Sequence, residues 1–192
     1  MGNVRLEKRP GGIVKQGYTM LYGKCQIIET KRLILREVEH GDAEAFFELF
    51  NEPEVMKYFS NTPRSIEEAH ERIQREINHY TEHGFGLWAT VLKDTEKVIG
   101  QCGLLAQIVD EVNETEIGYA LARKCRGQGL ATEAAKAIKN YGFNKLKFNR
   151  LISIIDPKNV ASQKVALRTG LAFEKTTTWM NTKVKIYSVQ GT

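Results

Sequence analysis

The stretch that decides the fold is EIGYAL at Glu116–Leu121, followed after a short connection by RGQGLA at Arg126–Ala131. Alternating apolar residues in the first part predict a strand over 114–121. Beyond the glycines, a helix is expected from Leu130 to about Leu146, on an apolar stripe of Leu130, Ala134, Ile138 and Tyr141. A glycine loop between a strand and a helix N-terminus predicts an anion site, because the first backbone N–H groups of a helix have no intrahelical partner.

The expected anion is a pyrophosphate. Gly127 and Gly129 let the backbone approach a phosphate closely, and Arg123, Lys124 and Arg126 add positive charge nearby. The loop has no GxxxxGK sequence followed by serine or threonine, as a Walker loop requires, and it lacks the third glycine of a Rossmann fingerprint. Taken alone, it is also compatible with a tight turn before a helix.

Elements of both types flank this stretch. Strands are expected over 32–37, 86–93, 97–106, 150–155, 173–178 and 183–189. Helices are expected after Asp42, after Ser65 with Glu68 as a capping box, and over 159–169 before Gly170. The order predicts a mixed α+β fold. Residues 25–192 are expected to form a single domain, and residues 1–24, rich in glycine and without periodicity, a flexible extension.

The composition narrows the class of protein. With 42% hydrophobic and 27% charged residues, the chain is an ordinary globular protein. A net charge of +5 favours acidic partners, but no aromatic–basic motif supports nucleic acid. The three cysteines form no CxxC pair, which argues against a disulfide framework or zinc. Without a membrane span or signal peptide the expected location is the cytoplasm, and monomer and homodimer both remain open.

Four motifs together resemble a known family. The RxxGxA pattern at 126–131 resembles the acetyl-CoA loop of the GNAT superfamily of N-acetyltransferases. Three further stretches resemble its RimJ/RimL-like branch: TKRLILR at 30–36, the hairpin GLWATV at 86–91 with VIGQCGL at 98–104, and PKNVAS at 157–162 with GLAF at 170–173. The resemblance covers roughly residues 27–189, with the motifs in the expected order.

The resemblance implies a GNAT-like acyl-CoA N-acyltransferase fold, in which helices flank a mostly antiparallel central sheet. Strands 114–121 and 150–155 would run parallel and splay apart, exposing backbone groups that need partners. Acetyl-CoA would be the cosubstrate, its pantetheine pairing near Ala120, Leu121 and Ala122. Its pyrophosphate would bind Arg126, Gly127, Gln128, Gly129, Leu130 and Ala131. Asn159 would bond the cofactor, cap its own helix, or do both.

The implied activity is direct acetyl transfer to a primary amine, either a protein N-terminus or a small molecule, without a covalent enzyme intermediate. Glu116 matches the position of a glutamate that acts through water, and an ordinary strand carboxylate is the alternative. Many relatives use a tyrosine as the acid, but this chain has none between Tyr141 and Tyr187. Ser162 is therefore the candidate donor, unless it only stabilises its helix. The alternative function is an acetyl-CoA-binding regulatory module without catalysis.

Two further patterns have weaker functional interpretations. His79 and His83 are spaced like a metal pair on a helix, but no third ligand is evident, so a solvated helix face is expected and no metal. Four aromatic residues, Tyr58, Phe59, Trp88 and Trp179, are candidates for the acceptor pocket or for the core.

Overall fold

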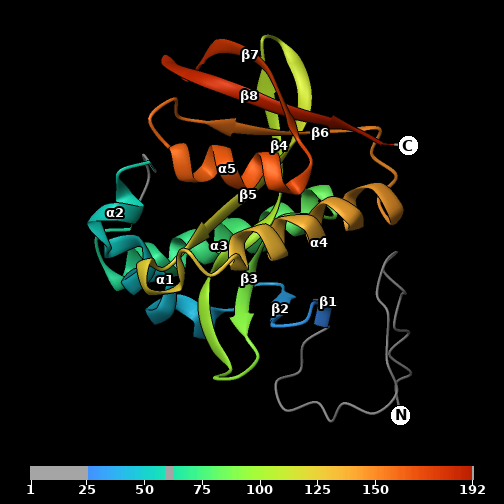
Figure 1. Ribbon diagram of the computed structural model, residues 1–192. Helices are drawn as coiled ribbons and strands as arrows, with labels where there is room; N and C mark the ends of the chain where they lie inside the picture. The colour runs from blue at the N-terminus through green and yellow to red at the C-terminus, as the bar shows by residue number, and fades with distance from the viewer. Residues whose placement is uncertain (1–25, 59–62, 192) are drawn as a thin grey trace.

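A computed structural model of the protein describes residues 26–58 and 63–191 (Figure 1). The expected N-terminal extension lies outside these residues. Eight strands form one sheet in the order β1-β2-β3-β4-β5-β6-β8-β7. Their bounds are Gln26–Glu29 (β1), Leu33–Arg36 (β2), Leu87–Leu92 (β3), Lys97–Val109 (β4), Val112–Leu121 (β5), Arg150–Ile155 (β6), Ala172–Trp179 (β7) and Thr182–Gln190 (β8).

The helices occupy the positions that the sequence predicts, with one addition. They are α1 (Ala43–Asn51), α2 (Pro53–Met56), α3 (Ile66–His83), α4 (Leu130–Asn144) and α5 (Val160–Thr169), with short 3-10 turns η1 (His40–Asp42) and η2 (Arg123–Cys125). The short helix α2 was not expected. In the view of Figure 1, α4 and α5 lie in front of the sheet. Helix α1 contacts α3, and α4 contacts α5.

The residues predicted to begin and end α3 and to end α5 do so, with one correction to the predicted capping box. Gly84 adopts φ +74° after α3, and Gly170 adopts φ +95° after α5, both in the left-handed region that glycine favours. The Ser65 hydroxyl accepts a hydrogen bond from the backbone N–H of Glu68, as predicted. The predicted capping box is nevertheless incomplete, because the Glu68 carboxylate accepts from the N–H of Arg64 instead of that of Ser65.

The splayed strand pair that the resemblance implies is present. All neighbouring strands pair antiparallel except β5 and β6, which are parallel. Their register contains the single pair Glu116–Ile152. One residue further on, the Ser153 hydroxyl spans the widening gap and donates to the carbonyl of Ile117 at 2.9 Å. The opening between β5 and β6 therefore begins beside Glu116 and faces the last residues of β5.

The core holds α4 firmly against the sheet. A Cβ on Gly142 would lie 3.0 Å from a methyl carbon of Leu151, so the helix approaches β6 closely at that point. The ring of Tyr141 packs edge-on against Trp88 of β3, with centroids 4.9 Å apart. Leu130 and Ile138 on α4 are fully or almost fully buried. The N-terminus of α4 is thus fixed relative to the end of β5.

Within the part of the chain that the structure describes, no helix combines the length and the apolar character that crossing a membrane requires.

Candidate active site

The loop before α4 presents backbone to open space. Gly127 and Gly129 both have φ +78°, a left-handed conformation that costs glycine little. A Cβ on Gly127 would meet nothing within 4 Å. Gly129 is the N-cap of α4 and, as a glycine, has no side chain that could cap the first N–H groups of the helix. This arrangement fits an anionic ligand at the positive end of the helix dipole.

A network from the start of β2 holds this loop in place. The Glu133 carboxylate, in the first turn of α4, accepts hydrogen bonds from the Thr30 hydroxyl at 2.6 Å and from the Arg32 Nε at 2.7 Å. Arg32 Nη1 also donates to the carbonyl of Gln128 at 3.0 Å, inside the loop. Burial opposes ionisation of Glu133, but the bonds from Thr30 and Arg32 outweigh it and lower the pKa of the carboxyl. The motif at 30–36 therefore anchors the glycine loop.

Replacing Glu133 by glutamine should loosen the loop. The change keeps the side-chain volume but removes the charge that Arg32 pairs with at 2.7 Å. We expect unfolding in urea to lose about 1–2 kcal/mol of stability, since the pair is only partly buried, and amide hydrogen exchange over 127–131 to accelerate. The control is Glu174→Gln, which removes the charge that pairs with Arg150, because both of these residues lie far from the loop in the sequence. Equal exchange rates in the two variants would contradict the anchoring role.

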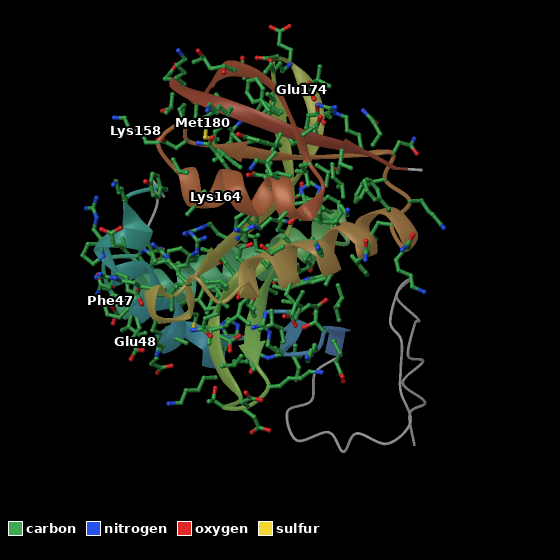
Figure 2. All side chains as sticks on the ribbon, in the orientation of Figure 1. Phe47, Glu48, Lys158, Lys164, Glu174 and Met180 are labelled. Carbon is green, nitrogen blue, oxygen red and sulfur yellow. The ribbon has the colours of Figure 1, made fainter. Side chains whose placement is uncertain are left out.

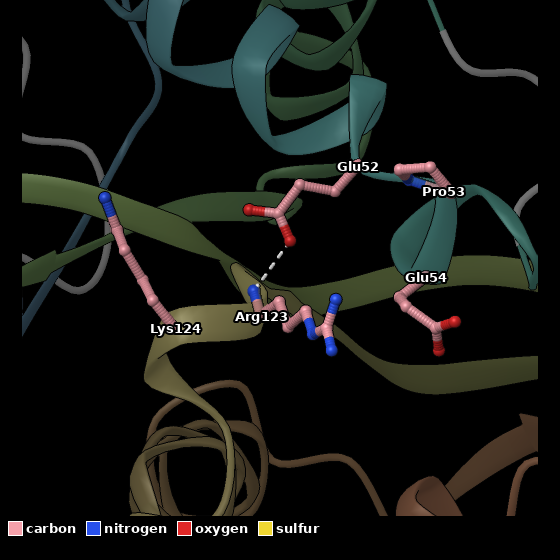
Figure 3. A pocket seen from close by; sticks show the side chains of 5 residues that line it. All are labelled: Glu52, Pro53, Glu54, Arg123 and Lys124. Carbon is pink, nitrogen blue, oxygen red and sulfur yellow. Dashed lines mark hydrogen bonds between the residues drawn. The ribbon is translucent and has the colours of Figure 1, made fainter.

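Basic residues surround the loop, although Arg126 itself turns inward. Its Nε lies 3.5 Å from the carbonyl of Leu121 and its Nη2 lies 3.3 Å from that of Glu54. A pocket of about 610 Å³ lies between α2 and η2, lined by Glu52, Pro53, Glu54, Arg123 and Lys124 (Figure 3). There the backbone N–H of Arg123 donates to the Glu52 carboxylate at 2.7 Å (Figure 3). The exposed residues Lys158, just before α5, and Lys164, in the middle of that helix, carry further positive charge (Figure 2).

The backbone that faces the opening can be assigned to particular residues of β5. Successive residues of a strand direct their backbone groups to opposite edges. Because the carbonyl of Ile117 faces β6, the groups of Tyr119 and Leu121 face the opening beyond it. Ala120 pairs with Gln101 of β4, and the N–H of Ala122 donates to Ile99 at 2.9 Å. Of the predicted stretch 120–122, Leu121 is thus the residue whose N–H points into the gap.

Glu116 lies at the closed end of the opening. Its carboxylate accepts a hydrogen bond from the Gln107 amide at 2.8 Å and a long one, 3.4 Å, from the backbone N–H of Ile154 on β6. Burial raises the pKa of this carboxyl, and the bonds from Gln107 and Ile154 only partly oppose the rise. A carboxyl whose pKa is raised toward neutrality is suited to exchange a proton with a substrate.

Ser162 lies opposite a residue that the sequence analysis did not single out. Its hydroxyl donates to the phenol oxygen of Tyr119 at 3.0 Å, and the same phenol donates to the Ser162 carbonyl at 2.9 Å. The Asn159 side chain caps α5 by accepting from the Ser162 N–H at 3.0 Å, which confirms the capping prediction. The hydroxyl of Ser162 therefore bonds across to β5. The phenol beside Ser162 thus comes from β5 and not from the part of the chain after α5, where the family resemblance would place a tyrosine.

The two candidate catalytic groups approach the opening from opposite sides. Side chains alternate along a strand, so Glu116 and Tyr119, three residues apart, point to opposite faces of β5. The β4–β5 register runs without a bulge from Val112 to Leu121, which keeps the alternation intact. Ser162 shares the face of Tyr119. A carboxylate and a hydroxyl thus flank the gap between β5 and β6.

The aromatic candidates for the acceptor pocket that the structure describes lie in different surroundings. Trp88 is buried against Tyr141 in the core. Trp179 borders a groove of about 510 Å³ that Gln107, His83 and Met180 also line. The Tyr58 hydroxyl lies 3.5 Å from the carbonyl of Lys158. Phe59 lies outside the described residues.

Cys125 and the histidine pair His79 and His83 have surroundings that the structure defines. Cys125 is buried beside the loop, and burial raises the pKa of its thiol, which lowers the thiolate fraction that a nucleophile needs. The rings of His79 and His83 lie tilted against each other with centroids 4.3 Å apart, and the Nδ1 of His79 bonds the carbonyl of Phe85. Among the residues described, no three His, Cys, Asp or Glu side chains group closely enough to hold a metal ion.

Comparison with known proteins identifies the family. The acetyltransferase (GNAT) domain family matches residues 32–172. The uncharacterized protein YkkB of Bacillus subtilis (strain 168) is 36% identical over 159 residues, 82% of this chain and 92% of that protein. The uncharacterized N-acetyltransferase p20 of Bacillus licheniformis is 35% identical over 152 residues, 78% of this chain and 83% of that protein.

Solved structures agree with the sequence comparisons. The structure of RimL, a ribosomal L7/L12 α-N-protein acetyltransferase in complex with coenzyme A, superposes with a TM-score of 0.74 at 18% identity. The match covers 86% of this chain and 98% of that one. The predicted GNAT fold and the resemblance to the GNAT superfamily are therefore confirmed, and acetyl-CoA is the cosubstrate of this family. The chain belongs to the GNAT family of acetyl-CoA-dependent N-acetyltransferases.

Proposed function

We propose that the protein transfers the acetyl group directly to a primary amine, with Glu116 as the base, Ser162 as a hydrogen-bond donor and a protein N-terminus as the acceptor. One observation carries the proposal. The carboxylate of Glu116 and the hydroxyl of Ser162 flank, from opposite faces, a gap in the sheet that begins at the pair Glu116–Ile152. Direct transfer needs a base on the acceptor side and a donor on the cofactor side.

The loop and the end of β5 would hold the cosubstrate. Acetyl-CoA, when bound, supplies an acetyl group activated as a thioester. The backbone N–H groups of residues 127–131 would bind its pyrophosphate, because the helix N-terminus carries no side-chain cap. The backbone of Tyr119 and Leu121 would pair with its amides, since β6 does not reach them. Asn159, already the cap of α5, would contribute its amide nitrogen.

Glu116 would keep the acceptor amine neutral. An α-amino group has a pKa of roughly 8 and a lysine roughly 10.4, so near neutral pH a larger fraction of a protein N-terminus than of a lysine is already neutral. Even with its raised pKa, the carboxylate of Glu116 is a weak base, which suits the N-terminus better than a lysine. RimL, whose structure is similar, is itself an α-N-protein acetyltransferase. Small amines are the alternative acceptors.

Thiol release from acetyl-CoA, measured with a panel of acceptors, tests the proposal. The panel contains short peptides with free N-termini, the same peptides with blocked N-termini, and small amines. We expect turnover with the free peptides and none with the blocked ones. Turnover confined to small amines would exclude the protein N-terminus, and binding of acetyl-CoA without turnover on any acceptor would contradict catalysis.

Replacing Ser162 by alanine should lower turnover more than cofactor affinity. The variant removes a donor but leaves the Asn159 cap on the Ser162 backbone intact. We expect kcat to fall by about ten-fold to a hundred-fold with little change in acetyl-CoA binding. Ser65→Ala is the matched control, because it removes a serine hydroxyl that caps another helix, at a cost of about 1 kcal/mol of stability. If the kcat of Ser162→Ala equals that of the control, Ser162 has only a structural role.

A further inference from the structure

The phenol of Tyr119 lies within hydrogen-bond distance of two oxygen atoms of Ser162. The Tyr119 oxygen lies 2.9 Å from the Ser162 carbonyl and 3.0 Å from the Ser162 hydroxyl oxygen. Both separations are within hydrogen-bond range for oxygen atoms. The two residues come from β5 and α5, 43 positions apart in the chain. No local turn brings them together, so the contact depends on the packing of α5 over the sheet.

Two hydrogen-bond arrangements satisfy these distances. In the first, Tyr119 donates to the Ser162 carbonyl and the Ser162 hydroxyl donates to the phenol, which is the arrangement described above. In the second, the Tyr119 proton turns to the Ser162 hydroxyl oxygen. A hydroxyl has one proton and two acceptor sites, so Ser162 can then direct its own proton elsewhere. The phenol thus controls where the serine proton points.

We infer that Tyr119 is a positioning residue that directs the hydroxyl proton of Ser162 into the opening between β5 and β6. The inference rests on the proposed role of Ser162 as a donor toward the cofactor sulfur. In the second arrangement the Ser162 hydroxyl accepts from Tyr119 and donates into the gap. Such a chain of hydroxyls polarises its terminal donor and strengthens the hydrogen bond it makes.

The surroundings keep Tyr119 in the protonated form that this role requires. Burial raises the pKa of the phenol, and the hydrogen bond with Ser162 opposes the rise only in part. The strand position is fixed by pairing of Tyr119 with Cys102 in β4. On the helix side, Asn159 holds the Ser162 backbone. The hydroxyl pair is therefore preorganised before any ligand binds.

The sheet offers a matched control for this phenol. Tyr187 of β8 donates to the side-chain oxygen of Gln163, the residue next to Ser162 on the same helix, at 3.0 Å. Tyr187→Phe and Tyr119→Phe therefore each remove one phenol that anchors α5. They differ in that only the second touches Ser162. A purely structural role would give both variants the same consequences.

The experiment combines these variants with Ser162→Ala. We expect Tyr119→Phe to lower kcat about ten-fold with the KM for acetyl-CoA within about two-fold, and Tyr187→Phe to keep wild-type kcat. The double variant Tyr119→Phe/Ser162→Ala should be no slower than Ser162→Ala, because the phenol acts through the serine. Independent, multiplicative losses, or equal losses in the two tyrosine variants, would overturn the inference.

Two readouts that involve no catalysis complete the test. In the ligand-free protein, the changes that Tyr119→Phe and Ser162→Ala cause in the free energy of unfolding in urea should be non-additive. Additive changes would show that the two hydroxyl groups do not interact and would overturn the inference. The thiol of free CoA should ionise near pH 8.5, by analogy with cysteine. Because Ser162 is proposed to donate to that sulfur, the affinity of the protein for CoA should rise with pH as the thiolate forms. Tyr119→Phe should flatten that rise. An unchanged rise would contradict the positioning role. If Ser162→Ala turns over like the wild type while the two variants remain non-additive in urea unfolding, the proposed role of Ser162 is rejected instead.

Discussion

Replacing Gly129 by glutamate is expected to abolish acetyl-CoA binding. The residue caps α4 with φ +78°, and a Cβ there would lie 3.7 Å from the Arg32 guanidinium, so a glutamate would bring a negative charge to the N-terminus of the helix, where the pyrophosphate is expected. Two like charges about 4 Å apart repel by about 4 kcal/mol at an effective dielectric constant near 20, which is roughly a thousand-fold in affinity. Calorimetric titration with acetyl-CoA measures this loss.

The control must reproduce the backbone strain without the local charge. Gly84 ends α3 with φ +74°, and a Cβ there meets nothing within 4 Å, so Gly84→Glu places the same residue in the same conformation far from the loop. Each variant should lose about 1–2 kcal/mol of stability from the left-handed conformation. Only Gly129→Glu should lose the cofactor. Unchanged affinity in a folded Gly129→Glu protein would contradict the assignment of the loop.

Replacing Glu116 by glutamine is expected to produce the second large effect, a loss of turnover of about a hundred-fold or more, as removal of a general base usually does. Glutamine keeps the shape and can still bond Gln107, but it cannot accept a proton. Acetyl-CoA affinity should be unchanged. Steady-state kinetics with a free-amine peptide measures the loss. Glu114→Gln is the control, because this neighbour faces the same side of β5 and pairs with Arg150.

The pH profile adds an independent check on Glu116. A base works when deprotonated, so wild-type activity should fall as the pH drops through the pKa of Glu116. Burial raises that pKa above its usual value, so the acidic limb should lie at a higher pH than an exposed glutamate would give. In Glu116→Gln this limb should disappear. Persistence of the limb, or equal losses in Glu114→Gln, would assign the base to another group.

Most of the fold was predictable because local signals and periodicity agreed. The strand over 150–155 and the helix that Gly170 ends match the structure, since β-branched residues and a left-handed glycine leave few alternatives there. The strand over 114–121 begins two residues earlier in the structure, at the hairpin turn after β4. Helix α2 was not predicted because its four residues, Pro53–Met56, are too few for a periodic pattern.

The site was predictable only where its residues are close in sequence. The glycine loop and the Asn159 cap are local, and their geometry follows from neighbouring residues. The anchor of the loop joins Arg32 to Glu133, 101 positions apart, and the Ser162 hydroxyl pairs with Tyr119 on another strand. Such contacts depend on the order of the strands in the sheet and on where the helices cross it, which local sequence patterns do not determine. Tyr119 was not predicted, although alternation along β5 puts its side chain on the same face as those of Ile117 and Leu121.

The central claim is that the loop over 126–131 holds the pyrophosphate of acetyl-CoA at the N-terminus of α4. A crystal structure of the protein with bound coenzyme A measures this most directly. We expect pyrophosphate oxygen atoms within about 3 Å of backbone nitrogen atoms in Gly127–Ala131, with the thiol in the gap between β5 and β6 near Ser162. A pyrophosphate bound elsewhere, with these N–H groups facing solvent, would contradict the account.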